Sequence, residues 1–268
     1  MSPRRLLVYA LGGGFCHLNR ALALSRAAMK RGYTVDVLSN TYAAQLFDFQ
    51  NAAVFDQAAD SPARITINAF SPHAPRDEVE KSITRIVRKL DYDVLIVDTF
   101  PRGLIGELAD ILPTLNRPKV LVHRDLNPRY IAQYDLQNFV RCYDSILSPG
   151  ENGPLSRLPT SQSTAPWLIC DSNELLSRRE AADALRFDAD DAKPVIAVLS
   201  NGKPNEQASH VSSASLLHEQ LGDRAVVRLV SLDQQIVQAH ANIGVRDCPF
   251  FDSTPESTWS SGPAATIQ

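Results

Sequence analysis

Short apolar runs alternate with amphipathic segments along the first 150 residues. The runs have the length of buried strands, and the segments between them repeat apolar residues at helical spacing. Strands are expected at residues 6–10, 34–38, 65–67, 94–97, 120–122 and 145–147. Helices are expected at residues 18–29, 78–90, 104–112 and 130–140. Because continuous apolar strands that alternate with helices are typical of a sheet covered on both faces, we predict an α/β fold with a Rossmann-like, doubly wound parallel sheet.

A second unit of the same kind follows a change in composition. Residues 149–166 are rich in Gly, Pro, Ser and Thr, as in a connection between domains. Beyond them we expect a helix that ends near Leu185, a strand at 195–199, a helix at 206–221 and a strand at 225–230. No clear periodicity follows Cys248. The predicted parts are a Rossmann-like domain (1–150), a linker with a connecting helix (151–190) and an incomplete second Rossmann-like domain (191–268).

Composition and charge exclude several classes of protein. The net charge of -3, without a run of Lys or Arg, argues against nucleic-acid binding. The four Cys residues lie far apart and lack metal-binding spacing, which indicates reduced thiols in a cytoplasmic protein. No stretch reaches the roughly 18 apolar residues of a membrane-spanning helix, which leaves peripheral contact with a membrane open. The sequence gives no indication of the oligomeric state.

A glycine turn follows the first expected strand. Gly12, Gly13 and Gly14 precede His17 at a strand-to-helix junction, where parallel sheets bind ligands. The dinucleotide fingerprint fits poorly, because His17 replaces the third glycine and Asp36 lies inside the second strand. A nicotinamide-dependent oxidoreductase is therefore the less favoured alternative. A His at a helix start can act as a base, or it can simply decorate an ordinary tight turn.

Two segments carry a family resemblance. Residues 7–24, with the glycine turn and His17, resemble the opening of MurG-like glycosyltransferases. Residues 92–108, with the run Asp98-Thr99-Phe100-Pro101-Arg102-Gly103-Leu104, look like a segment of predicted glycosyltransferases related to them. The resemblance covers residues 5–230 and implies a GT-B fold, with an acceptor domain followed by a domain for a nucleotide-diphosphate sugar. It implies a nucleotide-sugar co-substrate, with no cofactor and no obligatory metal ion.

The chain also departs from that family. The later glycine-rich loop and the acidic residue that hold the uridine have no convincing counterpart here, so we expect a truncated donor domain. On the resemblance we predict a hexosyltransferase of the inverting type, which transfers a sugar from a UDP-sugar to an unknown acceptor and is active only if the donor half is completed. The alternative is a non-catalytic remnant that binds a nucleotide or a sugar.

The resemblance also assigns candidate site residues. His17 is the expected catalytic base, and Asp98, at the end of a strand at the same edge of the sheet, would orient the imidazole or contact the acceptor. The leaving diphosphate would bind at the first loop of the second domain. The candidate substrate-binding residues are Gly12, Gly13, Gly14, Asn19, Arg102, Ser200, Asn201 and Gly202. Helix caps and ordinary turns are the alternative roles, and for His123, after the strand at 120–122, a surface salt bridge is preferred to an acceptor contact.

Overall fold

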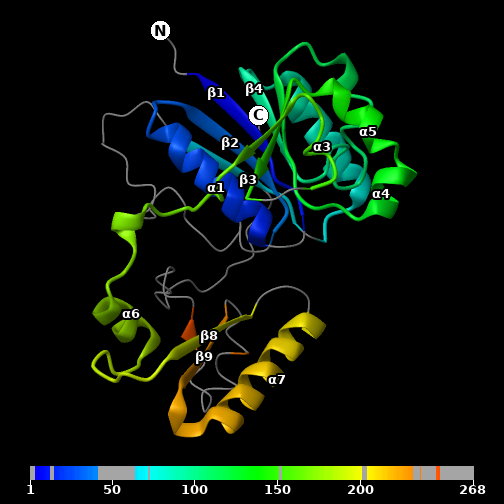
Figure 1. Cartoon of the computed structure of the whole chain (residues 1–268). Helices are drawn as coiled ribbons and strands as arrows, with labels where there is room; N and C mark the ends of the chain where they lie inside the picture. Colours follow the sequence, from blue (N-terminus) through cyan, green and yellow to red (C-terminus); the bar gives the residue numbers. More distant parts are fainter. Residues whose placement is uncertain are drawn as a thin grey trace. The chain divides into compact units, whose positions relative to one another are not determined.

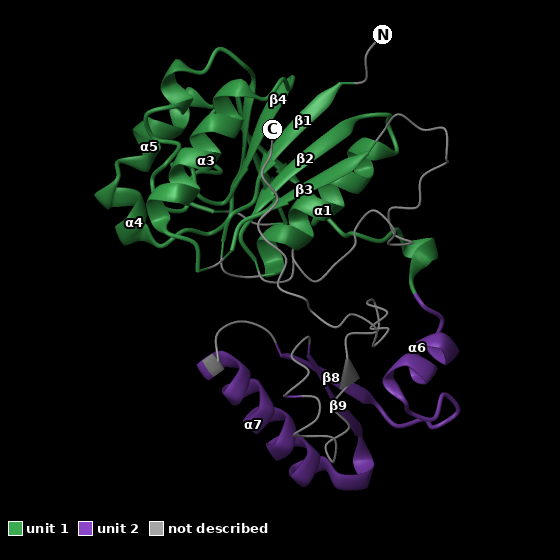
Figure 2. Cartoon of the chain, turned by 180° about the vertical axis from the view of Figure 1, so that it is seen from behind, with its two compact units in different colours: residues 1–175 green, residues 176–268 purple. Residues whose placement is uncertain are grey.

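The chain divides into two compact units (Figure 2). The computed structural model describes residues 4–12, 15–41, 64–71, 73–150, 153–200, 204–231, 236 and 246–247. The first unit comprises residues 1–175 and contains a large parallel sheet. The second comprises residues 176–268 and contains a small one.

The first sheet has seven parallel strands in the order β3-β2-β1-β4-β5-β6-β7 (Figure 1). They are β1 (Arg5–Tyr9), β2 (Thr34–Ser39), β3 (Ile65–Ala69), β4 (Val94–Asp98), β5 (Lys119–Val122), β6 (Ser145–Pro149) and β7 (Ser161–Thr164). The chain runs outward from β1 to β3 and then returns to place β4 on the other side of β1. This is the order of a doubly wound sheet, so the predicted Rossmann-like fold is confirmed.

Helices cover both faces of this sheet (Figure 1). Helix α1 (Phe15–Met29) packs on one face, and α3 (Arg76–Lys89), α4 (Pro128–Gln133) and α5 (Leu136–Phe139) lie on the other. Short 3₁₀ helices follow at η2 (Leu112–Thr114), η3 (Val140–Cys142) and η4 (Ser172–Glu174). Neighbouring residues of β1 point to opposite faces: Val8 packs with α1 and Leu7 with α3. Burial on both sides explains why β1 is apolar at every position from Leu6 to Tyr9.

Two expected helices are wrong in detail. Residues 104–111 form bends and turns, and side chains engage the backbone at the start of this segment. The N–H of Leu104 donates to Tyr9 Oη at 2.7 Å, and the N–H of Ile105 donates to Glu107 Oε2 at 2.9 Å. The single helix expected at 130–140 is divided into α4 and α5 at Asp135, whose φ of 45° is left-handed and incompatible with a continuous helix.

The first unit extends beyond the expected boundary at residue 150. Within the expected linker, β7 pairs in parallel with β6 and completes the first sheet. Its sequence, Ser-Gln-Ser-Thr, contains no apolar residue and therefore gives no strand signal. Helix α6 (Arg178–Leu185) is capped by Ser177, whose side chain accepts from the N–H of Glu180. The first compact unit thus ends at Leu175, and the connecting helix belongs to the second.

Helix α1 holds the end of the first unit. Arg26 Nη1 donates to the carbonyl oxygen of Ile169 at 2.7 Å, and the same guanidinium pairs with Glu174. The hydrogen bond from Arg26 lowers the pKa of Glu174 to about 2. Lys30 Nζ pairs with Asp171 in the same segment. These contacts fix the course of residues 169–174 along α1.

The second unit begins like the first. Strands β8 (Val195–Ser200), β9 (Val226–Ser231) and β10 (Arg246–Asp247) are parallel, in the order β10-β9-β8. Helix α7 (Pro204–Leu221) connects β8 to β9 and packs through Ala214 against Val227 and Leu229, and η5 (Gly222–Arg224) follows it. The prediction that a second unit with Rossmann-like strand-helix-strand order follows the first is confirmed. Within its described residues the sheet contains these three strands.

Candidate active site

The carboxyl ends of β1 and β4 mark the point where the strand order of the first sheet reverses. Tyr9 pairs with Val97, so Gly12 after β1 and Asp98 at the end of β4 lie at the same edge of the sheet. Helix α1 begins at this edge and presents His17 in its first turn. Doubly wound sheets bind their ligands at such a reversal. The two residues predicted to be catalytic therefore meet at this reversal, and their catalytic roles stay predictions.

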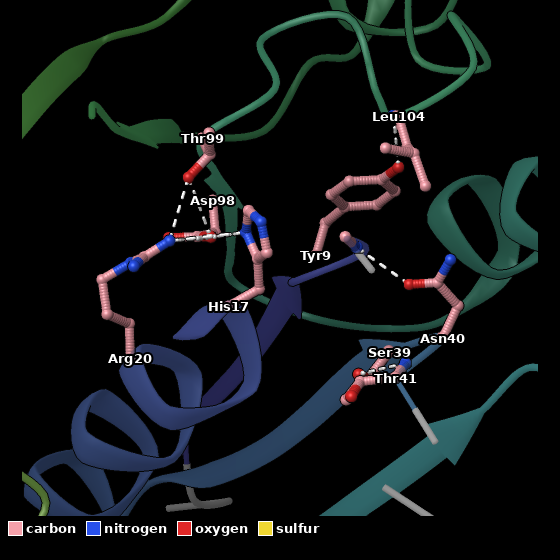
Figure 3. Close-up of polar contacts among 10 residues, drawn as sticks. Tyr9, His17, Arg20, Ser39, Asn40, Thr41, Asp98, Thr99 and Leu104 are labelled. Atoms are coloured by element: carbon pink, nitrogen blue, oxygen red, sulfur yellow. Dashed lines mark hydrogen bonds and ion pairs between the residues drawn. The ribbon is translucent and has the colours of Figure 1, made fainter. Parts of the chain in front are cut away.

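The structure brings His17 and Asp98 into direct contact (Figure 3). His17 Nδ1 lies 2.6 Å from Asp98 Oδ2. An ionised carboxylate only accepts hydrogen bonds, so Nδ1 carries a hydrogen in this contact, and in the neutral ring the lone pair is then on Nε2. The side chain of His17 is 11% exposed and that of Asp98 is 3% exposed. An imidazole held in this tautomer has the form of a general base.

Arg20 is a third member of the cluster, and the sequence reasoning missed it. Its Nε and Nη2 each lie 2.8 Å from an oxygen of Asp98, which makes a bidentate ion pair (Figure 3). Residues three positions apart share a face of a helix, so His17 and Arg20 both reach the same carboxylate. The H-x-x-R spacing was the available local signal, but the acidic partner is 78 positions away.

The charge state of Asp98 follows from these contacts. Burial is the largest influence and would raise the pKa of Asp98, but hydrogen bonds from His17 and Arg20 and the charge of Arg20 outweigh it. The net result is a pKa below the ordinary value of 3.8. Asp98 is therefore ionised at neutral pH and acts as an acceptor for both partners.

A sharp turn after β4 places an aromatic ring against His17. Thr99 has a φ of 64°, a left-handed conformation that costs a β-branched residue about 1–3 kcal/mol. Its hydroxyl accepts from Arg20 Nη2 at 3.0 Å, and its N–H donates to the carbonyl oxygen of Val122 at 2.9 Å. The next residue, Phe100, stacks on His17 with the ring centroids 5.5 Å apart. The turn thus encloses the imidazole between a carboxylate and a ring.

Gly12 provides the space that the imidazole occupies. A Cβ on Gly12 would lie 2.7 Å from His17 Cγ and closer still to Cδ2 and Nε2. The N–H of Gly12 donates to Asn40 Oδ1 at 2.8 Å, so a side chain from the neighbouring strand end holds the turn (Figure 3). Asn40 was not a candidate from the sequence. Gly13 and Gly14 lie outside the described residues.

Gly12→Ala should lower the free energy of unfolding by about 1–3 kcal/mol, because the added methyl group overpacks the His17 ring. Urea denaturation followed by fluorescence measures this change. The matched control is the same substitution in a His17→Ala chain, where the ring is absent and the methyl group should cost little. Equal destabilisation in both backgrounds would show that Gly12 serves the turn alone.

The loop that carries Phe100 is anchored on β1. Tyr9 Oη donates to Glu107 Oε1 and accepts from the N–H of Leu104. Burial, with a contribution from the charge of Glu107, raises the pKa of Tyr9 well above its usual value. Glu107 is 5% exposed, and the left-handed Gly103 leaves room for its carboxylate. These residues fix the loop relative to the strand that precedes His17.

The remaining candidates of the first unit lie apart from this cluster. Asn19 is partly buried on α1, two positions after His17, which turns its side chain by about 200° around the helix axis. Arg102 lies with its guanidinium carbon 5.0 Å from the ring centroid of Tyr134 and 5.5 Å from that of Phe139. The roles of Asn19 and Arg102 as substrate contacts stay predictions.

The candidates of the second unit follow β8. Ser200 is the last residue of this strand and is 3% exposed, and among the described residues its Oγ has no hydrogen-bond partner. Asn201 and Gly202 lie outside the described residues. Helix α7 begins at Pro204, so Ser200 stands at a strand end just before a helix N-terminus. That is where anions bind in such folds, and the contact itself stays a prediction.

His123 is not at the surface, contrary to the preferred explanation of a surface salt bridge. It is 0% exposed, and its Nε2 accepts from the N–H of Leu155 at 3.2 Å. A Cβ on Gly153 would lie 2.9 Å from its Cδ2, so the ring packs directly on that glycine. His123 therefore has a structural role beneath the loop that follows β6.

Asp36 gives no support to a dinucleotide site. It lies inside β2, paired with Leu7, and is 3% exposed. Its carboxylate accepts from Arg5 Nε at 2.6 Å and from Arg5 Nη2 at 3.0 Å. The carboxylate is occupied within the sheet, away from the edge where a ribose would bind. The dinucleotide fingerprint has its third glycine where this chain has His17, and the ring of His17 packs on Gly12 instead.

Two kinds of feature are missing from the described part of the chain. Its His, Cys, Asp and Glu residues include no group of three or more arranged to hold a metal ion. Its helices include none with both the length and the apolar character that crossing a membrane requires.

Comparison with known proteins shows likeness in structure alone. No protein-family model matches the sequence, and no curated protein matches it significantly. A solved structure named as a UDP-N-acetylglucosamine 2-epimerase from Listeria monocytogenes aligns with a TM-score of 0.55 and 13% identity, over 92% of this chain and 69% of its own. UGT73P12 of Glycyrrhiza uralensis, complexed with glycyrrhetinic acid 3-O-monoglucuronide, aligns with a TM-score of 0.52 and 13% identity, over 92% and 68%.

MurG of Acinetobacter baumannii also aligns, with 14% identity over 94% of this chain and 68% of its own, but the TM-score of 0.48 is too low to add to the argument. The chain thus spans about two thirds of the length of these structures. At such identities the likeness establishes how the chain folds. The activity has to be inferred from the residues of the site. The chain has the GT-B fold of the nucleotide-sugar glycosyltransferases.

Proposed function

We propose that this chain transfers a sugar from a nucleotide-diphosphate sugar, with a UDP-sugar as donor, to a hydroxyl group of an acceptor bound by the first unit. The observation that carries the proposal is the His17–Asp98 pair at the reversal of strand order. A preoriented base at this edge is what an acceptor hydroxyl requires, because a neutral hydroxyl is a weak nucleophile. The GT-B fold supports the same reaction class by analogy.

The proposed reaction is a single displacement. His17 Nε2 takes the proton from the acceptor hydroxyl, and the oxygen forms a bond to C1 of the sugar. The bond between C1 and the diphosphate oxygen breaks, and its electron pair leaves with UDP. Asp98 accepts the Nδ1–H hydrogen bond throughout and stabilises the imidazolium that forms. A single displacement inverts the configuration at C1.

Arg20 is a positioning residue in this scheme. It holds both oxygens of Asp98, so the carboxylate cannot rotate away from His17. The left-handed Thr99 adds a hydrogen bond to the same guanidinium. This preorganisation fixes the imidazole without motion during the reaction.

Binding of the donor is assigned to the second unit. The leaving diphosphate needs hydrogen-bond donors and positive charge, which the N-terminus of a helix provides. Ser200 precedes α7 and its buried hydroxyl has no partner among the described residues, which supports this assignment.

Release of UDP tests the proposal. The whole chain is incubated with UDP-glucose or UDP-N-acetylglucosamine and a panel of hydroxylated acceptors, and free UDP and the glycosylated product are measured. We expect UDP release that depends on the acceptor and produces an inverted linkage. No binding of either nucleotide sugar by calorimetry at millimolar concentration would contradict the assignment.

Two other functions make different predictions. A non-catalytic remnant that binds nucleotide or sugar predicts binding without turnover and no response to His17→Ala. The likeness to a structure named as a 2-epimerase favours isomerisation of the donor sugar itself. Epimerisation would change the sugar in the absence of acceptor, which NMR of the nucleotide-sugar pool detects.

A further inference from the structure

The acceptor class follows from a row of aromatic side chains that starts at His17, if the proposed transfer is correct. We propose that Phe100, Tyr130, Tyr134 and Arg102 form the acceptor subsite, and that the acceptor is a small hydroxylated ring compound with one carboxylate or phosphate group. The rings would contact the acceptor ring, and Arg102 would bind its anionic group.

The rings are continuous with the base. Phe100 stacks on His17 at 5.5 Å with an interplanar angle of 27°. Tyr130 meets Phe100 edge to face at 6.4 Å, and Tyr134 meets Tyr130 at 5.0 Å. Tyr134 is 39% exposed, and Phe100 and Tyr130 are partly exposed. Partly exposed rings next to a base offer flat apolar surface to a substrate ring, in offset or edge-on contact.

Arg102 ends this row with an unused charge. Its guanidinium stacks with Tyr134 and Phe139, and within the described part of the chain its buried Nε has no hydrogen-bond partner. No ion pair with a described carboxylate involves it, in contrast to Arg20. A guanidinium held in one plane by rings matches the two oxygens of a carboxylate or phosphate. An incoming anion would pair with the guanidinium, whose charge no described carboxylate neutralises.

Phe100 and Arg102 lie on one short loop. Phe100 and Arg102 are separated by one residue, so their Cα atoms are at most about 7 Å apart. The carbonyl oxygen of Pro101 between them accepts from Tyr143 Oη at 2.6 Å, which fixes this part of the loop. Both ends of the proposed subsite therefore belong to one fixed loop, and the acceptor proposed for it is a molecule of one or two rings, with the hydroxyl at one end and the anion at the other.

Binding of paired probes to the whole chain tests the subsite. The probes are 4-hydroxybenzoate, 4-hydroxyphenyl phosphate and the neutral methyl 4-hydroxybenzoate, each titrated by NMR. We expect at least one of the two anions to bind about tenfold or more tightly than the ester, because a charge-assisted hydrogen bond accompanies ring contact. The anion that binds more tightly shows whether the acceptor carries a carboxylate or a phosphate group.

Variants separate the charge from the ring. Arg102→Gln should abolish the preference for the anion and leave the ester unchanged, whereas Tyr134→Leu should weaken all three probes. Arg129→Gln, which removes an exposed charge from α4 next to Tyr130, is the matched control and should keep the preference within about twofold. Arg102→Lys keeps the charge without the planar fork and should retain part of the preference.

The outcomes distinguish this inference from the proposed function. His17→Gln should slow transfer and leave the preference for the anion over the ester in place, because Arg102 provides that preference. A preference for the anion without acceptor-dependent UDP release in the unmodified chain therefore refutes the transfer alone. If UDP release depends on the acceptor and is unchanged in the Arg102→Gln chain, the proposed subsite is refuted and the proposed transfer is not. Equal affinity for anion and ester, equal losses in the Arg102→Gln and Arg129→Gln chains, or no binding of any probe at millimolar concentration would each overturn the inference.

Discussion

His17→Gln is expected to lower the rate of sugar transfer by about 10²–10⁴-fold, which is the usual contribution of a general base. The amide group of Gln can still donate to Asp98, so the carboxylate keeps a partner, but it cannot take a proton from the acceptor. Initial rates of UDP release measure the loss. Calorimetric titration with the donor should show an affinity within about twofold of that of the unmodified chain, because the donor is assigned to the second unit.

A second histidine provides the control for this prediction. His218 is exposed on α7, and His218→Gln should leave the rate unchanged. A His17→Gln chain that transfers sugar at the unmodified rate would show that another group removes the proton. A loss of donor affinity in that chain would instead show that His17 belongs to the donor site.

Asp98→Asn is expected to lower the free energy of unfolding by about 3–5 kcal/mol. Asp98 is 2% exposed and is the partner of both His17 and Arg20. Removing its charge leaves the Arg20 guanidinium buried without compensation, which is more costly than the absence of the pair as a whole. Urea denaturation at neutral pH measures the change, and transfer should fall as well because the tautomer of His17 is no longer enforced.

The pH dependence of this loss has a definite sign. The folded-state pKa of Asp98 lies below its ordinary value of 3.8, so the carboxylate stabilises the folded chain fully above that value. The stabilisation is lost as the pH falls from the ordinary pKa through the folded one. The difference between the unmodified and Asp98→Asn chains should therefore be constant near neutral pH and shrink in acid.

A double substitution checks the cause. Arg20→Met in the Asp98→Asn chain removes the uncompensated charge and should recover part of the lost stability. If the two substitutions instead destabilise additively, the ion pair does not explain the loss.

Most strands of the two sheets were predictable because they are buried on both faces. The runs at residues 6–9 of β1 and 94–97 of β4 are apolar at every position, and their short length and flanking turn residues favour a strand over a helix. β7 was not predicted, because it is a polar strand at the edge of the sheet. Its pairing with β6 produces no periodic pattern of apolar residues. The false helix at 104–112 arose because Glu107 and Tyr9 engage its backbone, and these residues lie 98 positions apart.

The candidate site was predictable in part. Strand ends that meet at one edge are a property of parallel sheets, so the proximity of His17 and Asp98 followed from the order of the elements. The direct contact between them, and the roles of Arg20 and Asn40, depend on side-chain directions that the element order does not determine. The left-handed turn at Thr99 has no sequence signal, because a β-branched residue there opposes ordinary backbone preference.

The tautomer of His17 tests the central claim most directly. ¹⁵N chemical shifts of the ring in histidine-labelled protein, assigned by comparison with the His17→Gln chain, report which nitrogen carries the hydrogen in mildly alkaline solution. The account predicts a hydrogen on Nδ1, donated to Asp98, and an unprotonated Nε2 that can receive a proton from the acceptor. A hydrogen on Nε2, with Nδ1 turned to accept from Arg20 Nη2 at 3.4 Å, would leave the substrate without a base and contradict the account.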